Sequence, residues 1–479
     1  MKKRTALLKK ILCIGGIVGA LGSVTFSSFS VPAQAADLSG DSDYDGIDDI
    51  YDPSPENNTF GGILNTYYAN SNVNFKMDYR WFFGDNSSYN PDLSTMSLLY
   101  AASMNGVNTV SIDGGTGGKA AAMSAYFGMK DVEDIRLSDY YNDNDLSEMV
   151  IAHREVSYNG EAKDILLMAL RGTNSSIQEW SSNFDVGDIS GFDSNSQWVT
   201  PKVHRGFDVT SQRIMKKTEE YISRYGLDKS KIVYWITGHS RGGALANVVG
   251  AYYENMGKKA FVYTFAAPNT TLDHTAGTYK SIFNIVNKDD FITYLPVEAW
   301  GYYKYGKSAS VSISSDYSGE FRNLTGLRYD AQGESGRNKT LKSIAGMISG
   351  DPRTELYSYE GSGKSVNKTF WSDNTRANYL NKIPTCASAY SIDTLSGNRR
   401  AFWGSKFSSV QAPAFYLQLL ASVLAGKTSY TDYIAIDVAS RYESAKYAIV
   451  GTAISGAKKP HYEECYYILT KSLTQGNFR

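Results

Sequence analysis

The chain has 479 residues, of which 42% are hydrophobic and 20% charged, and its formal net charge is −1. This composition is ordinary for a globular protein that buries a core. The length allows two or three domains, or one large α/β domain with insertions. A near-neutral chain has no broad electrostatic reason to bind nucleic acid, so we expect no nucleic-acid partner.

The first 35 residues have the pattern of a secretory signal peptide. Five basic residues lie within the first ten positions, and the stretch Ile11–Phe26 is apolar and uncharged. Ala33-Gln34-Ala35 follows as a small-residue cleavage pattern. The alternative is an uncleaved membrane anchor, but the apolar run is short and glycine-rich for a span. The pattern predicts cleavage after Ala35 and a secreted protein.

Removal of residues 1–35 takes away five basic and no acidic residues, so the formal net charge becomes −6. Cys386 and Cys465 are the cysteines that remain. In an oxidising compartment they could form one disulfide, but the sequence leaves their pairing open. Two cysteines without a His/Cys cluster do not indicate a zinc site.

An aspartate-rich segment, 36–60, comes next. Its candidate metal ligands fall within twelve residues, and they are Asp41, Asp43, Asp45, Asp49 and Asp52. Gly46 allows a sharp turn, and hard cations such as Ca²⁺ take oxygen ligands. The first six residues from Asp41 fit the start of an EF-hand loop, but the rest does not. Ile47 lies one position before the place of the apolar residue in that loop, and the twelfth residue is Asp52 rather than Glu. The segment more closely resembles the calcium repeats of thrombospondin type 3. We expect a structural Ca²⁺ site, and the alternative is an acidic solvated linker.

Alternating strands and helices predict an α/β domain with a mainly parallel sheet. Asn159-Gly160 between the first two strands indicates a hairpin. The predicted strands are Glu148–Tyr158, Asp164–Arg171, Lys231–Thr237, Ala260–Ala266 and Ser281–Val286, and the predicted helices are Leu93–Ala102, Ser211–Tyr225 and Gly243–Glu254.

Beyond Tyr305 the sequence no longer predicts a regular alternation of strands and helices. The stretch from Ser308 to about Lys406 is rich in Ser, Gly, Asn and Lys, and Ala412–Ala425 is an apolar helical stretch. We interpret 308–455 as an insertion into a single domain spanning 61–479, with the form of a cap.

The motif Gly238-His239-Ser240-Arg241-Gly242 reads G-x-S-x-G. Alone it occurs often by chance, and it could be a structural glycine-rich turn. Here a strand precedes it and a helix follows it, which is the arrangement of a nucleophile elbow. The flanking glycines allow the strained turn that exposes the serine hydroxyl. Ser240 is therefore the candidate nucleophile.

A serine hydroxyl needs a base to remove its proton. In α/β-hydrolases, which use such an elbow, the catalytic residues follow the order serine, acid, histidine along the chain. His153 and His204 precede Ser240, His239 is its neighbour on a sharp turn, and His274 comes before any good acid. His461 remains as the base. Asp289 and Asp290 follow a strand and are the candidate acids.

Four segments, in order, resemble the class 3 (fungal-type) triacylglycerol lipases. They are LRGTNSSIQEW at 170–180, VHRGF at 203–207, TGHSRGG at 237–243 and NKDDFITYLPVEAWGY at 287–302. The resemblance implies an α/β-hydrolase fold with a mainly parallel central sheet flanked by helices. It favours Asp290 as the acid, because two apolar residues follow it. His204 then has a packing role.

The resemblance also suggests further site residues. The backbone N–H groups of Thr173 and Arg241 would form the oxyanion hole. Ile177, Trp180 and Phe184 form one apolar helix stripe where the family has its lid, although a core-facing helix gives the same stripe. Three departures from the family pattern are Arg241 in place of leucine, Thr293 in place of proline, and the large insertion between the acid and the histidine.

Together these features predict a secreted serine hydrolase that cleaves carboxylic esters of lipids through Ser240, Asp290 and His461, with no cofactor for the chemistry. The partner would be a lipid or other acyl ester, with contact to a lipid interface. A phospholipase A-type acyl hydrolase would use the same residues, and a peptidase is also compatible with a triad. A non-catalytic surface-binding protein on a hydrolase scaffold is the more distant alternative.

Overall fold

The structure of the chain is a computed structural model. It describes residues 36–37, 40–52, 54–112, 118–140, 147–172, 203–271, 273, 275–295, 302–329, 333, 335, 337 and 459–479. Apart from Ala36, these belong to one compact unit, Asp37–Arg479. The described strands are β1 (Ala36–Asp37), β2 (Thr59–Asn65), β3 (Asn70–Lys76), β4 (Thr109–Ile112), β5 (Lys130–Arg136), β6 (Glu148–Tyr158), β7 (Glu161–Leu170), β8 (Ile232–His239), β9 (Ala260–Phe265), β10 (Ile282–Asn287) and β11 (Lys307–Val311).

The described helices include both α-helices and short 3-10 turns. The α-helices are α2 (Pro91–Ser103), α3 (Ala120–Tyr126), α5 (Arg205–Tyr225), α6 (Arg241–Asn255), α7 (Ile313–Asp316), α8 (Ser318–Thr325) and α14 (Glu463–Ser472). The 3-10 turns are η2 (Tyr79–Phe83), η3 (Leu137–Asp139), η4 (Ala276–Thr278), η5 (Phe291–Tyr294), η9 (Lys459–His461) and η10 (Gln475–Asn477).

The central sheet runs in the order β6–β7–β8–β9–β10–β11, and β5 also pairs with β6. The strands from β7 to β11 pair parallel with one another, whereas β5 with β6 and β6 with β7 pair antiparallel. The hairpin predicted at Asn159-Gly160 is present, and both residues have positive φ, of 51° and 81°. This backbone matches the twist of the paired strands and explains the Asn-Gly sequence.

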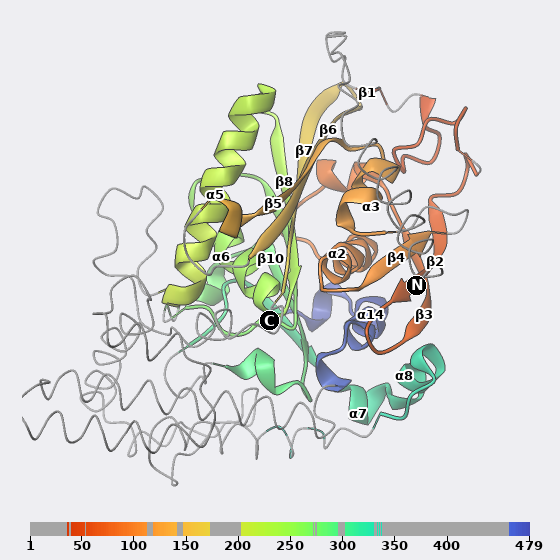
Figure 1. The fold of residues 1–479 in the computed structure, drawn as a ribbon, viewed down its shortest axis with the longest axis vertical. Coiled ribbons are helices and arrows are strands. Elements are labelled where there is room, and N and C mark those ends of the chain that lie inside the picture. Colours follow the sequence, from red (N-terminus) through yellow and green to blue (C-terminus); the bar gives the residue numbers. More distant parts are fainter. Residues whose placement is uncertain are drawn as a thin grey trace, which may run out of the picture. The chain divides into compact units, whose positions relative to one another are not determined.

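Helices cover both faces of this sheet (Figure 1). Helices α5 and α6 pack together on one face, and α2, α3 and α14 lie on the other. Every side chain of β8 is buried, and successive residues enter opposite cores, since Val233 and Trp235 belong to one and Tyr234 to the other. A strand buried on both faces reads as a continuous apolar run, as KIVYWIT does.

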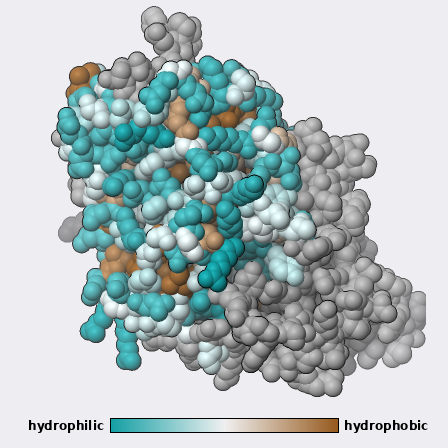
Figure 2. All heavy atoms as spheres, turned by 180° about the vertical axis from the view of Figure 1, so that it is seen from behind, coloured by the Kyte–Doolittle hydropathy of each residue, from teal (hydrophilic) through white to brown (hydrophobic). Residues whose placement is uncertain are grey.

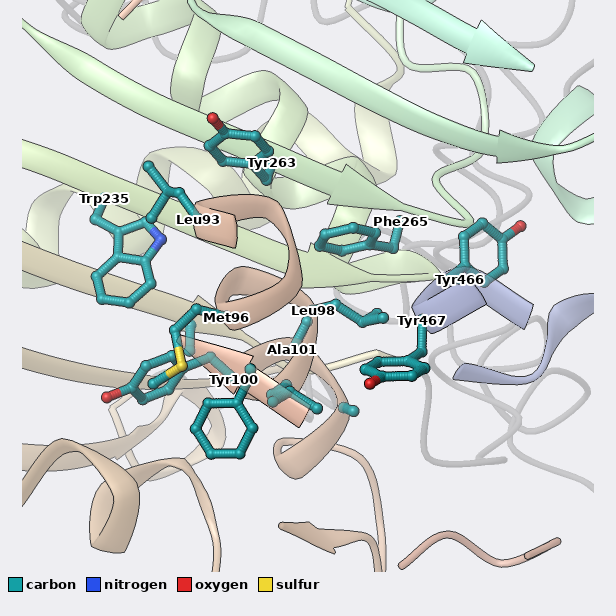
Figure 3. Close-up of a cluster of buried hydrophobic side chains, with 14 of the residues drawn as sticks. Leu93, Met96, Leu98, Tyr100, Ala101, Trp235, Tyr263, Phe265, Tyr466 and Tyr467 are labelled. Carbon is teal, nitrogen blue, oxygen red and sulfur yellow. The ribbon is translucent and has the colours of Figure 1, made fainter. Parts of the chain in front are cut away.

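The core on the α2 side joins distant parts of the chain. Figure 3 shows Trp235 and Tyr263 of the sheet beside Leu93 and Met96 of α2. The Trp235 indole N–H donates to Ser97 Oγ over 2.7 Å, so the buried ring keeps its hydrogen bond. A small antiparallel sheet in the order β3–β2–β4 lies beyond α2.

The C-terminal helix α14 packs against α2 and β10. Its Tyr467 hydroxyl accepts from Asn74 N of β3 over 2.8 Å, and Glu464 accepts from Thr66 Oγ1 over 2.7 Å. These contacts join residues nearly 400 positions apart, and they hold the short turn that ends at His461 beside the sheet.

The predicted helices and strands are confirmed, with shifts of a few residues at their ends. Helix α5 begins six residues earlier than predicted and ends before Gly226, whose φ of 66° is left-handed. The sheet also continues past Tyr305, because β11 pairs parallel with β10. Its sequence, KSASV, is polar for a parallel strand, since β11 lies at the sheet edge. The stretch Ala412–Ala425 lies outside the described residues.

Among the residues that the structure describes, no helix combines the length and apolarity needed to cross a membrane. On the face seen in Figure 2, hydrophobic residues form small separate groups within a mainly hydrophilic surface.

Candidate active site

Ser240 lies on a strained turn between β8 and α6. Its φ of 58° and ψ of −127° are outside the usual regions for a residue with a side chain. A Cβ at Gly238 would lie 2.2 Å from Gly242 O, and a Cβ at Gly242 would lie 2.2 Å from Leu170 O. The turn therefore needs both glycines, because only they let the backbone pass this closely.

The structure brings Ser240, His461 and Asp290 into one hydrogen-bonded chain. His461 Nε2 is 2.9 Å from Ser240 Oγ, and His461 Nδ1 is 2.6 Å from Asp290 Oδ2. A neutral imidazole that donates its Nδ1–H to the carboxylate presents Nε2 as the acceptor for the serine O–H. This is the geometry that a serine needs in order to lose its proton during attack.

Asp290 lies three residues after the end of β10 and caps η5. Its Oδ1 accepts from Ile292 N over 3.0 Å, and its Oδ2 accepts from the Tyr466 hydroxyl over 2.7 Å as well as from His461. The carboxyl group is buried, with 1% of the side chain exposed. Three donors compensate the burial of this acid and hold it in one orientation.

The environment of His461 works on its pKa in two directions. Burial lowers the pKa of the imidazole, but the charge of Asp290 and its hydrogen bond raise it, and the net pKa lies above the ordinary value of 6.5. A raised pKa means that His461 holds a proton firmly once it has accepted one.

Asp289 has a different environment from Asp290. Its carboxylate accepts from Ser312 Oγ at 2.8 Å, Ser314 N at 2.8 Å and the Tyr329 hydroxyl at 2.9 Å. These bonds tie the end of β10 to the segment after β11. Of the two candidate acids, the structure thus joins Asp290 and not Asp289 to a histidine.

His153 and His204 make their contacts away from the Ser240 hydroxyl. His153 is held between Asp164, at 2.8 Å, and Asp131, at 3.0 Å. His204 is fully buried and stacks on Phe207 with ring centroids 4.0 Å apart, in agreement with a packing role. His274 lies outside the described residues.

The ring of His239 lies beside the ring of His461. The two rings are 4.9 Å apart, and Asn105 Nδ2 lies 3.4 Å from His239 Nδ1. Burial, reinforced by His461, lowers the pKa of His239 to about 3, so the ring is neutral. Glu463 accepts from Asn105 over 2.9 Å and from Asn108 over 3.0 Å.

Three residues near the triad escaped the sequence interpretation, namely Tyr466, Asn105 and Glu463. Tyr466 lies five positions after His461 on the adjacent helix, a spacing that could have pointed to it once His461 was chosen. Asn105 follows α2, more than 130 positions before Ser240, and no local pattern links them.

The structure describes only part of the predicted oxyanion hole. Arg241 is the first residue of α6, and its buried guanidinium donates to Ser147 Oγ and to Thr210 Oγ1. Gly172 N donates to Asn105 Oδ1 over 2.9 Å, and a Cβ at Gly172 would be 3.0 Å from His239 O. The segment leading to Thr173 therefore reaches the elbow. Thr173 and the stripe Ile177, Trp180 and Phe184 lie outside the described residues.

The aspartates of the predicted metal site divide into two groups. Asp41, Asp43 and Asp45 converge, with one carboxylate oxygen of each within 4.8 Å of the others. Asp49 lies apart, and its two oxygens accept from Ser42 N and Ser42 Oγ at 2.8 Å and 2.7 Å. Asp49 is thus not among the converging carboxylates, and the metal site itself stays a prediction.

Cys465 is a buried free thiol whose Sγ lies 3.0 Å from Lys459 O. Cys386 lies outside the described residues.

A part of the chain that contains Ser240 and Asp290 matches a known family model. Residues 167–300 match the family model described as lipase (class 3). Similar solved structures include the triacylglyceride lipase of Rhizomucor miehei, at 20% identity over 47% of this chain and 80% of that chain, with a TM-score of 0.32. The mono- and diacylglycerol lipase of Aspergillus oryzae matches at 18% identity over 47% and 81%, with a TM-score of 0.32.

The matched segment contains β8, Ser240, α6 and Asp290, and the sheet of the structure is mainly parallel with helices on both faces. This arrangement fits the α/β-hydrolase fold. The class of protein that the fold and the family match support is a lipase-like ester hydrolase.

Proposed function

We propose that this protein is a secreted serine hydrolase that cleaves the carboxylic ester bonds of lipids. The observation that carries the proposal is the relay from Ser240 Oγ to His461 Nε2 and from His461 Nδ1 to Asp290, with distances of 2.9 Å and 2.6 Å. Such a relay activates a serine for acyl transfer, and ester hydrolysis is the reaction of the matched family.

In the proposed mechanism, the Ser240 hydroxyl attacks the ester carbonyl while His461 accepts its proton. His461 then donates that proton to the leaving alcohol, which departs and leaves an acyl group on Ser240. Water, activated by the same imidazole, releases the acid and regenerates the serine. Asp290 holds the tautomer of His461 and stabilises the imidazolium that forms transiently. None of these steps requires a cofactor.

We also propose that the developing oxyanion is bound by the backbone N–H groups of Arg241 and Thr173. Two observations support this placement. Arg241 begins α6 directly after the nucleophile, and Gly172, which precedes Thr173, packs against the elbow. Each such donor contributes about 3 kcal/mol to lowering the barrier.

The lipid nature of the substrate rests on the class 3 lipase match, and secretion rests on the signal-peptide pattern of residues 1–35. A phospholipase with the same triad differs in the esters that it cleaves, so a panel of substrates distinguishes a phospholipase from a triacylglycerol lipase.

The stripe Ile177, Trp180 and Phe184 remains a candidate lid. Equal turnover of soluble and emulsified esters would argue against it.

The experiment measures hydrolysis of an ester chain-length series, emulsified triacylglycerol, phospholipids and casein. We expect ester hydrolysis by the native chain, and losses of at least about 10³-fold in Ser240→Ala and His461→Ala. Ser230→Ala is the matched control, because Ser230 is an exposed serine that bonds only Asp228 among the described residues.

A fluorescent alkyl phosphonate provides a second readout, since it should label the native chain and Ser230→Ala but not Ser240→Ala. Full activity in Ser240→Ala would refute the proposed hydrolase mechanism. Activity that survives only in His461→Ala would refute the assignment of the base.

A further inference from the structure

The loop 40–52 buries several carboxylates that the ester chemistry does not use. Asp41, Asp43 and Asp45 are 3%, 8% and 0% exposed, and one oxygen of each lies within 4.8 Å of the others. Ionised carboxylates almost never become buried together unless something compensates their charge.

Each of these aspartates uses one oxygen to order the loop. Asp41 accepts from Gly46 N at 2.8 Å, Asp43 from Asp45 N at 3.2 Å, and Asp45 from Ile47 N at 2.7 Å. Asp52 does the same with Ser54 N at 2.8 Å. The loop therefore presents its carboxylates in fixed orientations.

The second oxygen of each of the four carboxylates has no hydrogen-bond partner among the described residues. These buried atoms are Asp41 Oδ1, Asp43 Oδ2, Asp45 Oδ2 and Asp52 Oδ2. A buried acceptor without a donor costs about 1–3 kcal/mol, and more when it is charged. Four such atoms in one loop call for a ligand that binds oxygen and carries positive charge.

A buried arginine beside the loop does not meet this need. Arg154 of β6 lies beside the loop, but its Nη1 donates to the backbone oxygens of Gly46 and Phe127. One guanidinium also leaves an excess of negative charge beside four carboxylates.

We propose that Asp41, Asp43, Asp45 and Asp52 bind one Ca²⁺ ion. An all-oxygen set of carboxylates suits a hard cation, and the loop contains no nitrogen or sulfur side chain that would favour a transition metal. Their sequence spacing is one, three, five and twelve, and Gly46 at position six has a φ of 94°. Asp49, whose carboxylate accepts hydrogen bonds from Ser42, is outside the proposed ligand set.

The ion would hold the loop against the α/β domain. Tyr44 O accepts from Tyr79 N at 2.9 Å, and Asp43 O accepts from Asn58 Nδ2 at 3.3 Å. A Cβ at Gly46 would lie 2.4 Å from the Tyr79 ring, so the turn fits tightly into its surroundings. Because the loop contacts η2 and β6 directly, the site would stabilise the domain and not a free linker.

The test uses the full chain, stripped with a chelator and titrated with CaCl₂ or MgCl₂ in a calorimeter. We expect one Ca²⁺ per chain with micromolar to millimolar affinity and at least about tenfold weaker Mg²⁺ binding. Saturating Ca²⁺ should raise the Tm by about 5 °C or more.

Asp45→Asn and Asp43→Asn should lose Ca²⁺ binding and the thermal shift while keeping the metal-free Tm, because the amide retains the shape of the carboxyl. Asp49→Asn, in the same loop, is the matched control and should bind Ca²⁺ like the native chain. Absence of Ca²⁺ binding by the native chain would overturn the proposal. Unchanged binding in Asp45→Asn would overturn it too, whatever the ester hydrolase activity of the chain.

Discussion

At the scale of single residues, the pair His461 and Asp290 governs the expected pH dependence. His461 acts as a base only when neutral, and its pKa lies above 6.5 because Asp290 outweighs the effect of burial. Activity is therefore full above that pKa and declines as the pH falls through it. We expect the acidic limb of kcat/KM to lie above pH 6.5, as measured with a soluble ester.

Asp290→Asn should lower kcat by about 10³ to 10⁴-fold, because the amide no longer holds the productive tautomer. It should also move the acidic limb to lower pH, since the charge that raises the pKa of His461 is gone. An acidic limb at the same pH in the native chain and in this variant would contradict the pairing.

Tyr466 acts through Asp290, as a positioning residue. Tyr466→Phe removes a donor to Asp290 Oδ2 and should cost about 1.5–3 kcal/mol of unfolding free energy. The carboxylate then attracts the imidazolium proton more strongly, so the acidic limb of kcat/KM should move to higher pH. Urea unfolding and a pH–rate profile measure the two effects.

Tyr467→Phe is the matched control on the same helix, because its hydroxyl bonds only Asn74 of β3 among the described residues. This variant should lose stability without any change in the pH profile. An unchanged pH profile in Tyr466→Phe would show that Tyr466 is merely structural.

At the scale of elements, the close approach of α6 to β7 determines the elbow. In Gly242→Ala the new Cβ would lie 2.2 Å from Leu170 O and 2.8 Å from Arg171 C, and both are backbone atoms. Helix α6 would have to move, so we expect a loss of about 2–4 kcal/mol in stability together with most of the esterase activity.

Gly319→Ala is the control for that change, because a Cβ there meets no atom within 4 Å and the residue lies in helix α8. It should leave activity unchanged and stability equal or up to about 1 kcal/mol higher. Thermal unfolding and ester hydrolysis test both variants, and a fully active Gly242→Ala enzyme would disprove the steric argument.

At the scale of the whole molecule, α14 connects the C-terminus to the small N-terminal sheet through a buried acid. Burial, with Glu463 adding to it, raises the pKa of Glu464 to about 7 from its ordinary 4.5. The folded chain therefore binds this proton more strongly than the unfolded chain. Stability from this group is full below pH 4.5 and is lost as the pH rises to about 7, by about 3 kcal/mol.

Glu464→Gln stays neutral at every pH and should lack this part of the decline. Urea unfolding at pH 4.5 and 8 measures the difference between the two chains. Glu320→Gln, at an exposed position of α8, should retain the native pH dependence. Parallel pH dependence in the native chain and in Glu464→Gln would contradict the assignment.

The local parts of this molecule could be predicted from the sequence. Apolar runs, glycines and the Asn-Gly pair determine φ, ψ and burial within a few residues, so the strands, helices, hairpin and elbow followed from short segments. The order of residues along the chain was sufficient to select Ser240 and His461, and the resemblance to the class 3 lipases favoured Asp290 over Asp289. The polar strand β11 escaped prediction because an edge strand lacks the apolar run of its neighbours.

The tertiary structure decided which neighbouring candidates serve which purpose. Asp289 and Asp290 are adjacent in sequence, yet packing directs one to Ser312 and the other to His461. Asp49 is one of several aspartates in the same loop, but in the folded chain Ser42 donates to its carboxylate. Hydrogen bonds between parts of the chain hundreds of residues apart depend on how helices pack on the sheet, and no short stretch of sequence encodes that packing by itself.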